Sequence, residues 1–382
     1  MKVAVLGFGT VGVGVFEMLK NAEGMEQGTV LVRPGKDDTA FKRTSIEEIV
    51  NDPEIDAVAE LMGGIEPAFS YACAAIKAGK HFVTSNKALV AAKGIELSQL
   101  AYENNVGFLF SAACGGAVPY LHNLSIARQS DKILSLSGIL NGTTNYMLDS
   151  MQRLGLEYED ALKDAQKLGY AEADPTADVS GMDALRKIML ACAVSYDMLP
   201  TEGLLNEGIE NITANDVKHF SSKGYTCRLM VNGGKTRDGG VYAYVEPVLF
   251  RDSAPECSVL QNFNMACYEG LKSGRISLMG QGAGRYPTAS AVLRDLHGIE
   301  SGRKYMLRKE CRRVKAENDK CSHLYYVRVS EAMQDRIPAE TVETEGGVSR
   351  IVTVPMSVLK MHETAKKIRE DGGEIFFAAI GE

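Results

Sequence analysis

The chain has 382 residues, which is enough for two or three domains with buried cores. Hydrophobic residues make up 45% and charged residues 24%, as in ordinary globular proteins, and no stretch is apolar for long enough to predict a membrane partner. The net charge of −7, without a lysine- or arginine-rich run that offsets it, argues against nucleic acid as a partner.

The cysteine and histidine patterns give information on the location of the protein and on metal binding. Eight cysteines occur without a CxxC pair, so we expect reduced thiols and a cytoplasmic location. The six histidines are scattered and show no spacing typical of a metal site. Residues 3–19 are apolar, but glycines and Glu17 interrupt them and no cleavage site follows, so they do not predict a signal peptide.

The chain opens with a pattern typical of dinucleotide binding. Residues 2–6 predict a buried strand, GFGTVG follows at once, and residues 13–20 predict a helix. In such a unit the first glycine makes the tight turn, the second admits a pyrophosphate and the third lets the helix pack on the strand. The alternative is a glycine-rich turn without a ligand. The predicted cofactor-binding residues are Gly7, Phe8, Gly9, Thr10, Val11 and Gly12.

The second predicted strand, residues 29–33, ends in an arginine. Asp or Glu there would bind the ribose hydroxyls of NAD, whereas Arg33 suits the 2′-phosphate of NADP by bidentate contact. Lys36, Lys42 and Arg43 follow closely. The sequence therefore favours NADP(H) over NAD(H), with a solvent-facing arginine as the alternative.

Strands and helices alternate as far as residue 111. We predict strands at 57–61, 81–84 and 107–111, and helices at 45–50, 67–78 and 94–104. Gly63 follows the first of these strands and Lys87 the second, where ligands of doubly wound sheets gather. The pattern predicts an α/β fold with a Rossmann-type doubly wound parallel sheet and with Gly63 and Lys87 near the cofactor.

Beyond this region the segment CGGAVP, residues 114–119, predicts a turn whose carbonyls could line a ligand or cation site, although glycines also simply make turns. A helix at 119–129, a strand at 133–140 that ends in NGTTNYML, and a helix at 157–168 follow. From residue 227 to 279 the pattern favours strands, which predicts a mixed α/β second domain.

The most acidic motif is GYAEADPTADVSGMDALRK, residues 169–187. Its acids are Glu172, Asp174, Asp178 and Asp183. A helix from about residue 181 would place Asp183 and Lys187 four residues apart on one face, where carboxylates beside an ammonium suit a small zwitterionic substrate. The alternative is a solvated surface pair, with the acids favoured by the helix dipole.

Three motifs together, GILNGTTNYML, GYAEADPTADVSGMDALRK and GAGRYPTASAV, resemble those of homoserine dehydrogenases, over roughly residues 1–305. The resemblance implies NAD(P)H-dependent interconversion of L-aspartate 4-semialdehyde and L-homoserine, in threonine and methionine biosynthesis, by a homodimer or higher homo-oligomer. Another oxidoreductase that acts on a related amino-acid aldehyde or keto acid, and an NADP-binding regulatory protein without turnover, are the alternatives.

The resemblance also implies domains. We expect a Rossmann-type domain at 1–125 that is rejoined by 284–305, and a mixed α/β substrate-binding and dimerisation domain at 126–283. After a linker at 306–322, residues 323–382 resemble a small α+β module of the ACT type whose first helix is truncated or absent. We expect this ACT-like module to assist oligomerisation rather than to bind an amino acid.

The resemblance assigns roles to single residues as well. Lys187 matches the proton donor, because hydride transfer to an aldehyde builds negative charge on an oxygen that an ammonium can stabilise and protonate. The expected catalytic residues are Lys187, Lys87 and Asp183. The expected substrate-binding residues are Glu172, Asp178 and Asp183. Further cofactor-binding residues are Arg33, Gly63, Lys87, Gly169 and Gly284.

The chain departs from the family at two positions. Family members commonly have a glutamate for a monovalent cation where this chain has Ser111. The backbone carbonyls of Cys114, Gly116 and Val118 could still serve as ligands, but the loss of a carboxylate weakens such a site. Many relatives also have Asp after the arginine of the second strand, where Pro34 stands here, which removes an acid that could repel a 2′-phosphate.

Overall fold

The computed structural model describes residues 1–35 and 41–381, and the chain forms two compact units. The first unit contains Met1–Lys132, Ala193–Leu199 and Gly280–Arg313, and the second contains Ile133–Cys192, Pro200–Met279 and Val314–Glu382. Lys36, predicted as part of the basic cluster after Arg33, lies outside the described residues.

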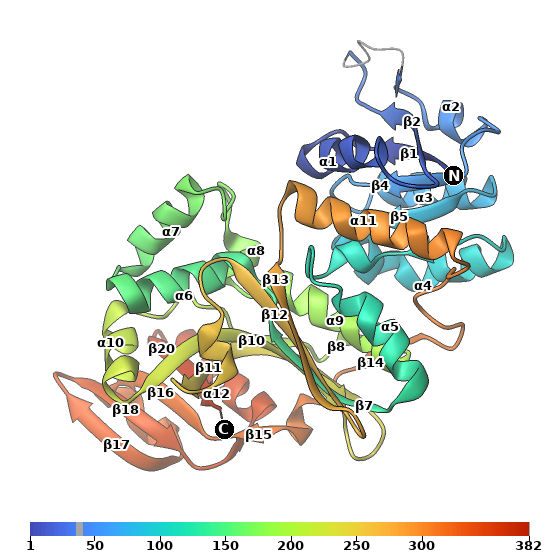
Figure 1. Ribbon diagram of the computed structural model, residues 1–382. Coiled ribbons are helices and arrows are strands. Elements are labelled where there is room, and N and C mark those ends of the chain that lie inside the picture. Colours follow the sequence, from blue (N-terminus) through green and yellow to red (C-terminus); the bar gives the residue numbers. More distant parts are fainter. Residues whose placement is uncertain (36–40, 382) are drawn as a thin grey trace. The chain divides into compact units, whose positions relative to one another are not determined.

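The first unit is built on a six-stranded parallel sheet in the order β3-β2-β1-β4-β5-β6. Figure 1 labels four of these strands, β1, β2, β4 and β5. Its strands are β1 (Lys2–Leu6), β2 (Glu26–Leu31), β3 (Lys42–Arg43), β4 (Ala57–Glu60), β5 (His81–Thr84) and β6 (Phe108–Leu109). The chain leaves the central strands β1 and β4 in opposite directions, which confirms the predicted doubly wound sheet. Val3, Val5 and Val58 are fully buried, as expected for strands covered on both faces.

Six α-helices lie wholly within the described residues of this unit. They are α1 (Thr10–Leu19), α2 (Ile46–Val50), α3 (Ala68–Lys77), α4 (Lys87–Glu103), α5 (Tyr120–Ser130) and α11 (Arg285–Glu300). The first and last of these pack against each other although they lie far apart in the sequence (Figure 1). The prediction of a helix only from residue 94 was wrong, because the side chain of Asn86 accepts the Leu89 N–H and starts α4 earlier.

The second unit contains a mixed ten-stranded sheet, which confirms the predicted mixed α/β architecture. Nine strands follow the order β13-β12-β7-β10-β11-β20-β16-β18-β17, and β9 pairs with β11. Their bounds are β7 (Ile133–Ile139), β9 (Leu205–Asn206), β10 (Tyr225–Lys235), β11 (Val241–Arg251), β12 (Phe263–Gly270), β13 (Gly274–Gln281), β16 (Tyr325–Ser330), β17 (Ala339–Glu345), β18 (Val348–Thr353) and β20 (Ile375–Ile380).

The helices that begin in this unit are α6 (Gly142–Leu154), α7 (Tyr158–Lys167), α8 (Thr176–Val179), α9 (Met182–Tyr196), α10 (Ala214–Ser222) and α12 (Val358–Glu370). The sequence predicted α7 and α9 but not α6, which follows β7 directly. Among the described residues, four further strands form two-stranded pairs outside the larger sheets: β8 (Met198–Glu202) with β14 (Arg312–Lys315), and β15 (Ser322–His323) with β19 (Met356–Ser357).

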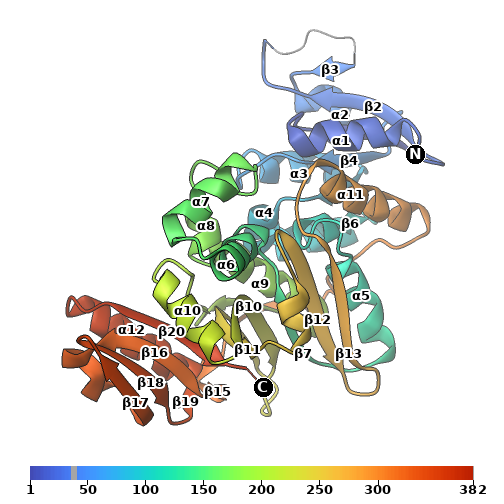
Figure 2. The ribbon, with the colours of Figure 1, turned by 60° about the vertical axis from the view of Figure 1, so that its left-hand side comes forward.

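The C-terminal segment continues the sheet of the second unit. Val248 and Leu249 of β11 pair in parallel with Ala379 and Ile380 of β20. Figure 2 shows β16, β17, β18 and α12 gathered beside β20, where a shared apolar core lies between them and the strands of the larger sheet. A short 3₁₀ helix, residues 331–336, stands where the first helix of an ACT-type module would be. The ACT-like module and its boundaries stay predictions.

Two further structural findings bear on the class of protein. No helix among the described residues is both long and apolar enough to cross a membrane. All eight cysteines are thiols in this structure, and five of them are buried: Cys114, Cys192, Cys227, Cys267 and Cys311.

Candidate active site

The glycine turn of the first unit joins β1 to α1. Gly7 has a φ of +94°, and a Cβ on Gly12 would lie 2.1 Å from the Gly7 carbonyl oxygen, so both positions require glycine. Gly9 precedes the first residue of α1, and among the described residues no atom lies within 4 Å of a Cβ built there. The turn therefore offers backbone N–H groups at a helix N-terminus with room for a phosphate to approach.

The carboxyl ends of β4 and β5 are joined by a buried glutamate. Glu60 is fully buried, and its carboxylate accepts the Thr84 hydroxyl at 2.5 Å and the Met62 N–H at 2.8 Å. Burial raises the pKa of Glu60 to about 7, although these hydrogen bonds oppose the shift. Glu60 thus fixes the loop that leads to Gly63, and sequence reasoning gave it no role.

The same edge of the sheet carries Lys87. The Asn86 amide donates to the Gly64 carbonyl at 2.6 Å while its oxygen caps α4, of which Lys87 is the first residue. The structure therefore brings the loop of Gly63 and the start of α4 together at the carboxyl ends of neighbouring strands. This is the place where doubly wound sheets bind nucleotides.

Arg33 lies two residues beyond the end of β2, in an exposed position. A second basic residue approaches the glycine turn from β3: the Lys42 ammonium lies 5.6 Å from the ring centroid of Phe8. Two positive charges therefore stand on the same side of β1, one after β2 and one on β3, where the ribose of a dinucleotide would be expected.

Asp183 and Lys187 lie in the second unit, on the first turns of α9. The Lys187 ammonium is 2.6 Å from the Asp183 carboxylate and donates to the Leu140 carbonyl at 2.5 Å. The two residues are only 9% and 8% exposed. The pair is therefore buried against the end of β7, unlike the solvated surface pair that was the alternative interpretation.

A second carboxylate lies beside this pair. The Asn141 amide donates to Asp178 at 2.6 Å and to Asp183 at 3.0 Å, and the Thr143 hydroxyl lies 3.1 Å from Asp178. Burial raises the pKa of Asp178, while the hydrogen bond from Asn141 lowers it and the charge of Asp183 raises it further. The structure thus joins Asp178, Asp183 and Lys187 into one network with the residues that follow β7.

The other predicted residues of this motif lie on an exposed loop between α7 and α8. Glu172 is exposed, and its backbone carbonyl accepts the Gln166 side chain at 3.2 Å. Gly169 has a φ of +74°, which a glycine tolerates. Gly284, in the first unit, has a φ of +122° and precedes α11. The structure does not bring Glu172 into the buried network of Asp178 and Lys187.

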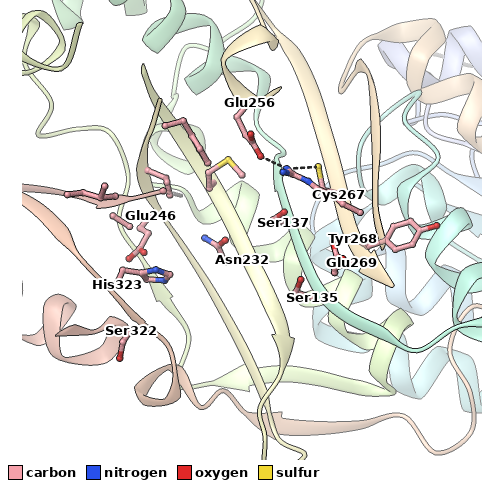
Figure 3. A pocket seen from close by; sticks show the side chains of 17 residues that line it. Ser135, Ser137, Asn232, Glu246, Glu256, Cys267, Tyr268, Glu269, Ser322 and His323 are labelled. Atoms are coloured by element: carbon pink, nitrogen blue, oxygen red, sulfur yellow. Dashed lines mark hydrogen bonds and ion pairs between the residues drawn. The ribbon is translucent and has the colours of Figure 1, made fainter. Parts of the chain in front are cut away.

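A cavity of about 460 Å³ lies on the face of the second unit's sheet that is opposite to α9. Gly233 of β10 packs against Ile188 and Cys192 of α9, so the neighbouring Asn232 points to the other face, where it lines this cavity (Figure 3). The other polar lining residues are Ser135, Ser137, Glu246, Glu256, Cys267, Tyr268, Glu269, Arg275, Ser322 and His323. None of the predicted site residues is among those that line it.

Comparisons with known proteins agree with this geometry. The family model for the NAD-binding domain of homoserine dehydrogenase matches residues 7–111, and the model for homoserine dehydrogenase matches residues 119–297. The homoserine dehydrogenase of Bacillus subtilis is 36% identical over 320 residues, which cover 78% of this chain and 72% of that protein. The chain belongs to the homoserine dehydrogenase family.

Solved structures of homoserine dehydrogenases share the fold. The enzyme from Thiobacillus denitrificans has a TM-score of 0.86 and 29% identity, with 100% of this chain and 98% of that chain covered. A hyperthermophilic archaeal homoserine dehydrogenase in complex with NADPH has a TM-score of 0.68 and 25% identity, with 79% and 98% covered. Family membership confirms the resemblance in the motifs and makes the chain an NAD(P)-dependent oxidoreductase.

The turn that carries the predicted cation ligands Cys114, Gly116 and Val118 is partly engaged by donors of the chain itself. The Ser111 N–H donates to the fully buried Asp295 at 2.7 Å, and Arg303 donates to the same carboxylate at 3.1 Å. The Val118 carbonyl accepts the Tyr120 N–H at 2.8 Å. The Ala117 carbonyl accepts Arg294 at 3.1 Å. The carboxylate and two carbonyls of this turn already have donors, and two of the donors are guanidinium groups, which would repel a cation.

Sequence reasoning about the homoserine dehydrogenase motifs did not single out four residues that contact the predicted site or its supporting loops: Glu60, Asn141, Thr143 and Asp295. A signal for Asn141 was present, because Asn directly after a strand and before GTTNYML suits the N-cap of a helix. Asp295 gave no such signal, since its partner Ser111 lies far away in the chain.

Proposed function

We propose that this chain interconverts L-aspartate 4-semialdehyde and L-homoserine with NAD(P)H as cofactor. The observation that carries the proposal is the buried ion pair of Asp183 and Lys187, with the Lys187 ammonium also held by the Leu140 carbonyl. Membership of the homoserine dehydrogenase family supports this reaction over the other two interpretations of the sequence.

Lys187 acts on the oxygen of the substrate. A bound nicotinamide supplies the hydride in the direction of reduction and accepts it in the direction of oxidation. When the aldehyde carbon gains a hydride, its oxygen becomes negative, and the Lys187 ammonium stabilises this charge and donates a proton to the oxygen. In the reverse direction the Lys187 amine takes the hydroxyl proton of homoserine. Asp183 and the Leu140 carbonyl hold the nitrogen of Lys187 in one position for both steps.

Asp178 and Asp183 suit the α-ammonium of the substrate. With both acids ionised, the charges of Asp178, Asp183 and Lys187 sum to −1, so a substrate ammonium would neutralise the network. We assign Glu172 to the same end of the substrate from its position on the exposed loop before α8. We assign Lys87, the first residue of α4, to the cofactor and to the substrate, as the resemblance to the family implies.

The cofactor residues follow from the first unit. The backbone of the turn from Gly7 to Gly12 would hold the pyrophosphate, and Gly63 and Gly284 would approach the cofactor through their backbones; Gly169, on the loop of the second unit, is proposed for the same role. Arg33, together with Lys42, favours NADP(H) because a 2′-phosphate needs positive charge. An archaeal relative in complex with NADPH supports this preference.

We also place the enzyme in the cytoplasm, as a homodimer or higher homo-oligomer in threonine and methionine biosynthesis. Eight free cysteines suit a reducing compartment. The C-terminal segment would assist the assembly of subunits.

The reaction is tested with the purified protein, NADPH and a panel of aldehydes. We expect loss of NADPH absorbance with L-aspartate 4-semialdehyde and production of homoserine, but slow turnover with the homologous aldehyde that is one methylene longer and with the analogue that lacks the α-amino group. An absence of turnover with L-aspartate 4-semialdehyde, or equal rates with the analogue that lacks the amino group, would overturn the proposal.

A further inference from the structure

Two consecutive residues at the end of β7 hold both ends of the ion pair on α9. The Leu140 carbonyl accepts the Lys187 ammonium at 2.5 Å, and the Asn141 amide donates to the Asp183 carboxylate at 3.0 Å. The end of β7 is itself held in place, because Ile139, which precedes Leu140, is paired with Met265 of β12 in the sheet. The position of the proton donor is therefore set from the strand end as well as from its own helix.

The orientation of the Asn141 amide follows from its partners. Its oxygen accepts the Thr144 N–H at 2.9 Å and so caps α6, which leaves the NH₂ group toward Asp178 and Asp183. Ionised carboxylates only accept hydrogen bonds, so the reverse orientation would set two acceptors against each other. One buried amide, 4% exposed, thus caps a helix with its oxygen and bridges two acids with its nitrogen.

The charges around this amide make the bridge important. Asp178 on α8 faces Asp183 and Lys187 on α9. The loop before α8 contributes the backbone carbonyl of Tyr170, which lies 2.6 Å from the Thr143 hydroxyl. Glu207, whose backbone lies near the start of α9, is paired with Arg369 and so adds little free charge. Two carboxylates share one ammonium here, and each needs a further donor to remain ionised in a buried place.

We propose that Asn141 is a positioning residue for catalysis: its NH₂ group keeps Asp178 and Asp183 side by side as carboxylates, and so fixes both the site for the substrate ammonium and the nitrogen of Lys187. The proposal rests on the proposed roles of Lys187 and the two acids. Capping the start of α6 needs only the amide oxygen of Asn141, so the proposal assigns a second function to its NH₂ group.

Two substitutions separate the NH₂ group from the helix cap. Asn141→Ser keeps an oxygen that can cap α6 but replaces the two N–H donors of the amide by one hydroxyl on a shorter side chain, without adding charge. Asn141→Asp also keeps the cap but places a third carboxylate beside Asp178 and Asp183. Ser357→Ala is the matched control, because it removes the N-cap of α12 in the same unit, where Ser357 accepts the Lys360 N–H at 3.2 Å.

We expect Asn141→Ser to raise the KM for homoserine by about 10- to 100-fold, as for the loss of a hydrogen bond to a charged group, and to leave the KM for the cofactor unchanged. Without the NH₂ group that bridges them, the two acids protonate more readily, so the acidic limb of the pH profile moves to higher pH. Asn141→Asp should lose more, because it adds like charge. Ser357→Ala should lower the Tm but leave both KM values and the limb in place.

The limb is measured as homoserine binding in the presence of NADPH, since homoserine cannot react with the reduced cofactor. Binding tests the role of Asn141 separately from the role of Lys187. Turnover in Lys187→Ala would refute Lys187 as the proton donor, but the binding limb of Asn141→Ser could still be measured and compared with that of the wild type. Wild-type homoserine affinity and an unshifted limb in Asn141→Ser would overturn the proposal. A lowered Tm with an unchanged limb would do the same, since it would leave Asn141 only the role of a cap.

Discussion

The N–H and the hydroxyl of Ser111 both donate to the carboxylate of Asp295, although the two residues lie 184 positions apart in the chain. Arg303 neutralises the same buried carboxylate, and Arg294 donates to the neighbouring Ala117 carbonyl. The turn from residue 111 to 118 is therefore held by fixed side chains of the same unit. Two guanidinium groups therefore place positive charge beside this turn.

This arrangement predicts an enzyme that does not depend on a monovalent cation. Replacing sodium or potassium by choline at constant ionic strength should leave kcat and KM unchanged, because Ser111 provides no carboxylate and the guanidinium groups repel a further cation. The thermal unfolding temperature should likewise be the same in the three salts. A several-fold activation or a clear stabilisation by potassium or sodium alone would contradict the prediction.

Glu60 should make stability depend on pH between about 4.5 and 7. Its pKa rises from 4.5 in the unfolded chain to about 7 in the fold, so over this range the unfolded chain releases a proton that the folded chain keeps. The free energy of unfolding therefore falls as the pH rises, by at most about 3 kcal/mol for this group.

Glu60→Gln should remove this part of the slope. Urea unfolding at several pH values should show the variant gaining stability relative to the wild type above pH 7, because a neutral amide can still accept the Met62 N–H. The exposed Glu23→Gln serves as the control and should follow the wild-type curve. Parallel curves for Glu60→Gln and the wild type would show that Glu60 is ionised in the fold without a penalty.

Arg33 should discriminate between the two cofactors. Arg33→Ala should raise the KM for NADP(H) by about tenfold or more, as for the loss of a charge-assisted contact with the 2′-phosphate, and should change the KM for NAD(H) by less than about twofold. The measurement is steady-state kinetics with both cofactors. Arg153→Ala, which removes an arginine from the other unit, is the control. Equal effects of Arg33→Ala on both cofactors would refute the preference for NADP.

The sequence predicted best where the pattern is local. The strand of residues 2–6, the glycine turn and the helix after it were predicted because each depends on neighbours within a few positions. The helix α9 was predicted for the same reason, and with it the spacing of Asp183 and Lys187. Boundaries were less secure: the second strand was predicted at 29–33, but β2 is Glu26–Leu31.

The sequence could not predict what depends on contacts between distant segments. The burial of Lys187 requires the Leu140 carbonyl, which lies 47 positions away, and nothing local reveals that contact. The helix α6 was missed because Gly142 and two threonines are poor helix formers, so the Asn141 cap and packing have to favour it. Strand β17 is exposed along its whole length and lacks the apolar alternation from which strands are predicted.

The central claim is that the Lys187 ammonium, held by Asp183 and Leu140, is the proton donor for the substrate oxygen. Its most direct test compares the kcat of Lys187→Ala with that of Lys366→Ala, which removes an exposed lysine from another i,i+4 pair, while NADPH binding is measured on the same samples. We predict that Lys187→Ala loses at least about 100-fold in kcat and binds NADPH as tightly as the wild type, whereas Lys366→Ala retains both. A kcat of Lys187→Ala close to that of the wild type would contradict the account.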